Sequence, residues 1–384
     1  MAAIERKPGV CWLGTTLLPA LCGAVVIESI GLVEAKADTP PERGVIAFKY
    51  LNYQDRQPGI DRISVTAPSL MFAVPIQEQW LLSGSHTVDT VSGASPRYHS
   101  EPMSMSRMDD KRRGNDVRIT RYFPQSSVTV GGAHSKESDY LSRSVFAQGS
   151  WSTEDKNTTF NGGLAITRDV INPSNLVVIN ERKSVNEVML GVTQVLTPGD
   201  IVQVNYTRSQ GSGYFSDPYK FFDNRPRNKQ ADILLVRWNH HVSATDGTLR
   251  LGHRRYLDSF GIRSHTVTGE YVQPMPNGWT LAPFARLYSQ TAAKFYLGPV
   301  SPPEPSIPDG FVPGVTYLSE DQRLSSYGAR AFGFKLSKSM TPDVTVDFRY
   351  ERYQQRSEWA WGGGSSGIAP FSAQIFHIGV SYQF

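Results

Sequence analysis

The last segment of this chain alternates between two kinds of side chain. Reading backward from Phe384, every second residue is large and apolar: Tyr382, Val380, Ile378 and Phe376. The residues between them are small or polar: Gln383, Ser381, Gly379 and His377. A strand with one apolar face and one polar face fits a wall between hydrocarbon and an aqueous interior. This pattern therefore predicts a membrane-spanning β-sheet.

The same tail resembles the C-terminal assembly signal of bacterial outer-membrane β-barrels, in which the final strand carries a terminal Phe. The resemblance implies that the barrel-assembly machinery and the lipid of the outer membrane are partners of this chain. The residues that carry this signal are Phe376, Ile378, Val380, Tyr382 and Phe384.

Residues 1–37 read as a secretory signal peptide, which we expect to be cleaved. Arg6 and Lys7 form a short basic region, an apolar stretch follows over residues 10–26, and Ala35-Lys36-Ala37 offers a small-x-small cleavage site. Gly and Pro interrupt the apolar stretch, which argues against a transmembrane anchor. Both cysteines fall inside this segment, so the predicted barrel domain, 38–384, has no disulfide or cysteine metal site.

Bulk composition narrows the class further. After residue 37 no aliphatic run exceeds four residues, the length of 233–236, which is far shorter than the roughly 20 residues of a membrane helix. A membrane-spanning chain of this kind must therefore form a closed barrel, in which backbone groups pair between strands. A hydrophobic content of 39% suits a barrel with a polar lumen, and a net charge of +4 is too small to indicate nucleic acid.

Short turn sequences alternate with long polar segments, as is typical of outer-membrane barrels. The long segments are 92–115, 170–183, 212–228, 293–321 and 359–370. We predict an all-β, antiparallel up-and-down transmembrane barrel of about sixteen strands. The predicted strands are 43–53, 60–74, 78–91, 116–123, 126–135, 139–152, 158–169, 184–196, 200–211, 229–242, 248–257, 262–273, 279–292, 323–338, 343–357 and 371–384. Pro68 interrupts the second strand and the fourth is short, so fourteen strands is the alternative.

Four tryptophans agree with this topology. Trp80 and Trp279 begin predicted strands, whereas Trp151 and Trp238 lie near the ends of others. Tryptophan favours membrane interfaces, because its ring is apolar and its indole N–H needs a partner. An even strand number returns both termini to one side, so we expect the termini and all four tryptophans at the periplasmic rim.

Charged residues on two predicted strands indicate a polar lumen. Asp347, Arg349 and Glu351 alternate with apolar residues along 343–357, and Arg286 does the same in 279–292. An Arg that faced lipid at mid-bilayer would cost roughly 2–4 kcal/mol, so these four residues should line the pore.

The segment from His99 to Arg113 supports several interpretations. His99, Met103, Met105 and Met108 offer soft ligands for Cu(I), or they pack a loop that folds into the lumen. The adjacent charges either place a transverse field across a constriction or remain solvated at the surface. These charges are Asp109, Asp110, Lys111, Arg112 and Arg113.

Just before this segment, residues 88–96 read Val-Asp-Thr-Val-Ser-Gly-Ala-Ser-Pro. They resemble a V-D-x-[VI]-[ST]-G-A-[ST]-P motif of an uncharacterised bacterial outer-membrane β-barrel family of unknown function. The resemblance implies an outer-membrane location and, through the family's redox-related neighbours, a possible redox partner protein.

These features favour a porin-like channel or structural barrel without a cofactor. The alternatives are a scaffold barrel that docks a redox or metal partner in the periplasm or at the surface, and a barrel hydrolase. For the hydrolase, Ser85 and His86 are adjacent, but neighbours on a strand face opposite sides of the sheet. The sequence therefore predicts that the chain is not an enzyme.

Overall fold

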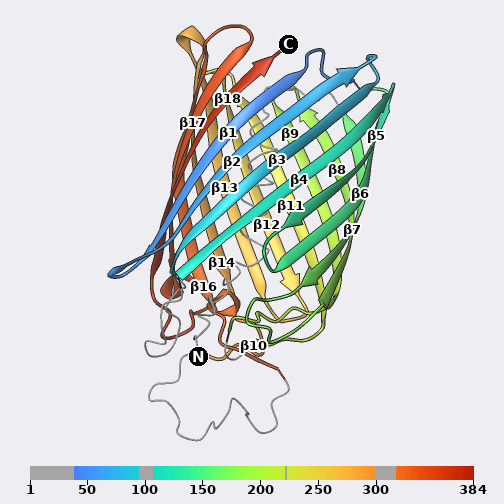
Figure 1. Cartoon of the computed structure of the whole chain (residues 1–384). Coiled ribbons are helices and arrows are strands. Elements are labelled where there is room, and N and C mark those ends of the chain that lie inside the picture. Colours follow the sequence, from blue (N-terminus) through green and yellow to red (C-terminus); the bar gives the residue numbers. More distant parts are fainter. Residues whose placement is uncertain (1–38, 95–106, 221–222, 299–316) are drawn as a thin grey trace, which may run out of the picture.

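The computed structural model describes residues 39–94, 107–220, 223–298 and 317–384. Sixteen strands form one closed barrel (Figure 1). They are β1 (Val45–Gln57), β2 (Ile60–Ile76), β3 (Trp80–Ala94), β4 (Arg107–Phe123), β5 (Ser126–Lys136), β6 (Tyr140–Ser152), β7 (Thr158–Ile171), β8 (Glu181–Thr197), β9 (Asp200–Gly213), β11 (Asn228–Val242), β12 (Gly247–Asp258), β13 (Arg263–Met275), β14 (Trp279–Gln290), β16 (Tyr327–Ser339), β17 (Val344–Arg356) and β18 (Phe371–Gln383). Two further strands, β10 (Asp223–Asn224) and β15 (Leu318–Ser319), pair outside the barrel.

Each barrel strand runs antiparallel to the strand before it, and β1 closes the barrel against β18. Val45 pairs with Gln383, and the backbone groups of Gly44 and Phe384 exchange two hydrogen bonds of 2.9 Å. The Phe384 ring lies over Gly44, where a Cβ atom would meet the ring at 2.5 Å. The predicted pairing of the last strand with the segment 43–53 is therefore confirmed.

The prediction of sixteen strands is confirmed, and the alternative of fourteen is wrong. β2 runs through Pro68, which pairs opposite Tyr50 of β1. The predicted loop 92–115 was also wrong in part, because β4 begins at Arg107 and its charged residues extend the ladder with β3. Conversely, the strand predicted from 323 begins at Tyr327, since Gln322–Leu324 forms a 3₁₀ turn.

The connections at one end of the barrel are all short, whereas the other end carries the long connections together with the short ones between β1 and β2, β5 and β6, and β12 and β13 (Figure 1). We call these ends the short-turn rim and the long-loop rim. At the short-turn rim, Asn277 and Gly278 adopt positive φ angles of 61° and 73°, as a tight hairpin turn requires. Trp80, Trp151 and Trp279 lie at or next to strand ends on this rim, and Trp238 lies four residues inside it, so the predicted grouping is confirmed.

Alternating side chains give the wall two faces. In β18, Ile378, Val380 and Tyr382 are exposed on the outside, whereas Ile375 and His377 are buried on the inside. Apolar residues exposed on the outside recur around the barrel, which is the lipid-facing band that the terminal strand predicts. Among the described helices, none is long and apolar enough to cross a membrane.

Candidate lumen site

Three of the four predicted pore residues form one charge cluster on the inner wall. Glu351 of β17 accepts hydrogen bonds from Arg286 of β14 at 2.9 Å and from Arg349 at 3.3 Å, and it is only 3% exposed. The strand between them, β16, places Ala331 opposite Arg286 and Gly333 opposite Glu351. Because these residues are small, the two charged side chains reach each other across β16.

An aromatic ring supports the same cluster. The Arg349 guanidinium lies 4.0 Å from the centre of the Phe284 ring, a cation–π geometry. A Cβ atom at Gly333 would lie 2.6 Å from that ring, so glycine makes room for it. Arg349 is therefore held by a carboxylate and by a ring, which fixes the guanidinium on the lumen wall.

The fourth predicted residue, Asp347, belongs to a second ion pair on the same wall. The Lys49 ammonium of β1 lies 3.4 Å from its carboxylate. Gly379 of β18 pairs with both residues in the sheet, and a Cβ atom there would meet Asp347 Oδ2 at 2.3 Å. The ion pair therefore crosses β18 over Gly379, where any larger residue would push the Asp347 carboxylate aside.

Other inward-facing charges are also paired around the barrel. The pairs are Arg62–Asp55 at 3.6 Å, Arg112 Nε–Asp89 at 2.6 Å, Arg118–Asp116 at 2.8 Å, Lys183–Asp169 at 3.0 Å, Lys229–Asp258 at 3.2 Å and Arg250–Glu270 at 3.1 Å. Such pairing lets a wall carry many charges without a large net field.

A second part of the inner wall carries hydroxyl groups. Cross-strand contacts on β2 to β7 join Ser69 to Thr87 at 2.8 Å, Thr120 to Thr129 at 2.7 Å, Ser127 to Ser150 at 2.7 Å and Ser152 to Thr159 at 3.0 Å. Hydroxyls both donate and accept hydrogen bonds. The lumen therefore has a wall of ion pairs and a wall of neutral polar groups.

Two long connections are joined at the long-loop rim. Arg225, beside β10, pairs with Asp321, beside β15, at 2.7 Å, and Arg323 pairs with Asp217 at 2.5 Å. Although burial opposes it, the charges of Arg323 and Arg225 hold the pKa of Asp321 below its ordinary value. Beside this network, Phe260, Ile262, Ala293 and Leu324 form an apolar cluster. The described parts of these connections thus form an ordered cap at the rim.

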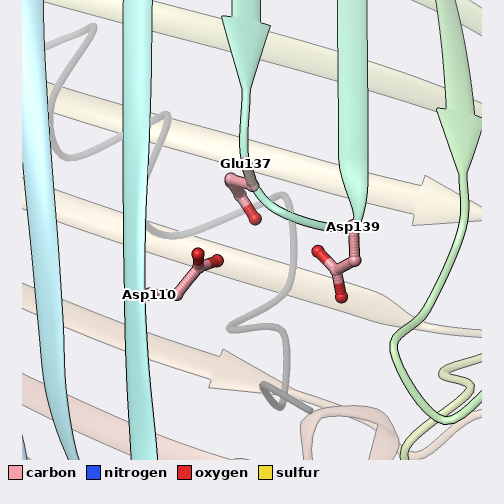
Figure 2. Close-up of side chains that lie close together, drawn as sticks. All are labelled: Asp110, Glu137 and Asp139. Carbon is pink, nitrogen blue, oxygen red and sulfur yellow. The ribbon is translucent and has the colours of Figure 1, made fainter.

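Three carboxylates lie close together at the long-loop rim. They belong to Asp110 of β4 and to Glu137 and Asp139 of the β5–β6 connection. Figure 2 shows the three side chains turned toward one another. One carboxylate oxygen from each residue lies within 4.8 Å of the other two. Tyr219 donates a hydrogen bond to Asp139, whose Oδ1 atom is buried without a hydrogen-bond partner among the described residues. Burial raises the pKa of Asp139, and the charge of Asp110 adds to this effect. Among the described residues, this group has the hard oxygen ligands that Ca²⁺ or Mg²⁺ prefers.

The predicted charge run is divided between the two faces of β4. Asp110 and Arg112 face inward, with Arg112 paired to Asp89, whereas Lys111 and Arg113 are exposed on the outside. Of the candidate pore residues in this run, Lys111 and Arg113 therefore do not line the lumen, because successive strand residues point to opposite faces. The Asp109 and Met108 side chains, and residues His99, Met103 and Met105, lie outside what the structure describes. The proline-rich part of 293–321 does as well.

The adjacent Ser and His of β3 diverge as expected. Ser85 donates to Asp116 on the inside, whereas His86 contacts Asn115 at 2.7 Å on the outside. Sequence reasoning missed Lys49 and Phe284. Only the register between strands that are distant in the chain brings Lys49 to Asp347 and Phe284 to Arg349. The alternation of Lys49 between Phe48 and Tyr50 was a usable signal for its inward position.

Fold and wall together define this protein as a sixteen-stranded barrel of the outer-membrane type. The chain belongs to the family described as protein of unknown function (DUF3570), whose model matches residues 97–375. The motif at 88–96 precedes that range, so the match does not depend on it.

Two solved structures show the same fold. A bacterial polysaccharide outer membrane secretin aligns with a TM-score of 0.52 and 8% identity, over 89% of this chain and 98% of that chain. CdiB from Acinetobacter baumannii aligns with a TM-score of 0.50 and 10% identity, over 88% of this chain and 60% of that one. No curated protein sequence matches this chain. At these identities the likeness shows the fold.

Proposed function

We propose that this protein is an outer-membrane channel for small polar solutes. The observation that carries the proposal is the inner wall of a closed sixteen-stranded barrel, lined by ion pairs and hydroxyl groups. At this strand number a barrel interior is wide enough for an aqueous channel. A wall of paired charges and hydroxyl groups offers exchangeable hydrogen bonds to a passing solute without a deep binding well.

The cap at the long-loop rim supports size selection in the same proposal. Ion pairs and apolar packing hold the two connections together at the long-loop rim, and we infer that they narrow the entrance on that side. A narrowed polar entrance favours small hydrophilic molecules over polymers.

The proposal also covers the processing, orientation and assembly of the chain. Residues 1–37 serve as a cleaved signal, residues 38–384 form the barrel, and both termini lie in the periplasm. The terminal strand is read by the assembly machinery, and the barrel has no catalytic role. A redox partner would need a docking surface, and no described residue group argues for one.

Liposome swelling tests the proposal. Liposomes that contain the purified chain should swell at rates that fall with solute size, from small amino acids to disaccharides. Liposomes prepared with heat-denatured protein provide the control. Equal rates in both preparations would overturn the channel assignment and leave a structural barrel.

A further inference from the structure

A row of cations crosses the outer surface of the barrel near the long-loop rim. Arg113 of β4, Lys136 of β5, Arg143 of β6, Arg168 of β7 and Arg182 of β8 are all exposed. These side chains point outward, because they alternate along their strands with inward-facing residues such as Arg112 and Asp169. Five consecutive strands therefore present positive charge to the surroundings of the barrel.

The strand register places like charges face to face in this row. Arg113 pairs directly with Lys136, and Arg143 pairs directly with Arg168. Like charges opposite each other on one face of a sheet destabilise it. None of the four forms an ion pair with a described side chain, and Arg168 contacts only the Thr167 carbonyl and Asn186. An anionic partner bound along this row would offset the repulsion.

The depth of the row identifies where that partner lies. The next outward residue beyond Arg143 is Val145, which is 60% exposed, and the one before Arg168 is Ile166, which is 44% exposed. On β4 the outward face continues from Arg113 through the polar residue Asn115 to exposed Val117, and on β5 it continues from Lys136 through His134 and Gly132 to exposed Val130. The cations thus lie at the edge of the apolar band, where lipid headgroups begin and where charged side chains are tolerated.

We propose that Arg113, Lys136, Arg143 and Arg168 bind the phosphates of lipid A, the phosphorylated glycolipid of the outer leaflet. Guanidinium groups bind phosphate in a bidentate manner, and four neighbouring strands spread them over about 14 Å. That span suits a headgroup with more than one phosphate. The apolar residues beside the row receive the acyl chains, which favours a lipid over free phosphate. The proposal rests on the proposed location, with the long-loop rim at the cell surface.

Binding of lipid A to the purified full-length chain in a zwitterionic detergent tests this site. The test variant carries Arg113→Gln, Arg143→Gln and Arg168→Gln. The matched control removes three cations at the short-turn rim, with Arg121→Gln, Lys156→Gln and Lys338→Gln. Each cation beside an anionic lipid surface contributes about fivefold in affinity, so the test variant should bind bisphosphorylated lipid A roughly a hundredfold more weakly. The control should bind within about twofold of the original chain.

Three results would overturn the site: unchanged binding by the test variant, equal binding of lipid A stripped of its phosphates, or equal binding of phosphatidylglycerol. The last result would indicate a general affinity for acidic lipid. Liposome swelling separates this site from the channel, because the test variant should swell liposomes at the original rate. If liposomes that contain the original chain do not swell although this chain binds lipid A, the channel assignment is refuted and the lipid A site stands.

Discussion

Replacing Glu351 with Gln should shift the ion selectivity of the lumen toward anions. The guanidiniums of Arg286 and Arg349 both pair with Glu351, whose single negative charge compensates one of their two positive charges. Gln retains the shape and accepts hydrogen bonds through its carbonyl, so the barrel should still fold. The change therefore adds one uncompensated positive charge to the wall.

Coulomb's law gives the size of the effect. For an ion that passes about 7 Å from the site in water, one unit charge changes its energy by about 0.6 kcal/mol. Anions are then enriched and cations depleted by roughly threefold each at low salt. At about 0.1 M salt, where the Debye length is ~10 Å, screening reduces the change in the anion-to-cation permeability ratio to roughly threefold.

The assay is the reversal potential across a planar bilayer under a potassium chloride gradient. Glu351→Asp retains the charge and should restore the original reversal potential. Asp232→Asn makes the same charge change on the outer face, beside Arg208, and should have little effect. If Glu351→Gln and Asp232→Asn shift the potential equally, ions do not pass beside Glu351.

Three further predictions concern assembly, pH and the rim. Deleting Phe384 removes two backbone hydrogen bonds to Gly44 and the aromatic ring that lies over Gly44. The yield of heat-modifiable folded barrel in membranes should therefore fall severalfold. A normal yield would contradict the role of Phe384 in assembly. Because burial raises the pKa of Asp139, its stabilising contribution is present below the ordinary Asp pKa and is lost as pH rises through the raised value. Protection factors at 137–139, which correct for the intrinsic pH dependence of hydrogen exchange, should therefore be higher at about pH 3 than at pH 7, and Asp139→Asn should abolish this difference. Arg225→Met removes the cation that pairs with the buried carboxylate of Asp223 and one of the two that pair with Asp321, a loss of about 3–5 kcal/mol for a buried pair. Proteolysis in the β9–β11 and β14–β16 connections should then accelerate while the barrel stays intact, and unchanged cleavage would refute the cap.

Most of the barrel could be predicted because its physics is local. Period-two alternation and turn residues depend on neighbours in the chain, so the existence of all sixteen strands followed from them. The start of β4 did not, since a run of Asp, Lys and Arg has low strand propensity and only pairing with β3 makes it a strand. The same extension moved Lys111 and Arg113 from an expected loop to the outer face.

The site was predictable in part for the same reason. Alternation placed Arg286, Asp347, Arg349 and Glu351 on the inner face, but it did not show which charges meet. The contact between Arg286 of β14 and Glu351 of β17 crosses the strand between them, β16. The contact from Lys49 to Asp347 joins segments near the two ends of the chain. Both contacts depend on the small residues Gly333 and Gly379, whose role appears only when the register is known.

The central claim is that this barrel conducts, and single-channel recording tests it most directly. Purified full-length protein added to a planar bilayer should produce discrete conductance steps of uniform size. A bilayer that stays at the level of the empty-detergent control, despite a folded and heat-modifiable barrel in the same preparation, would contradict the account.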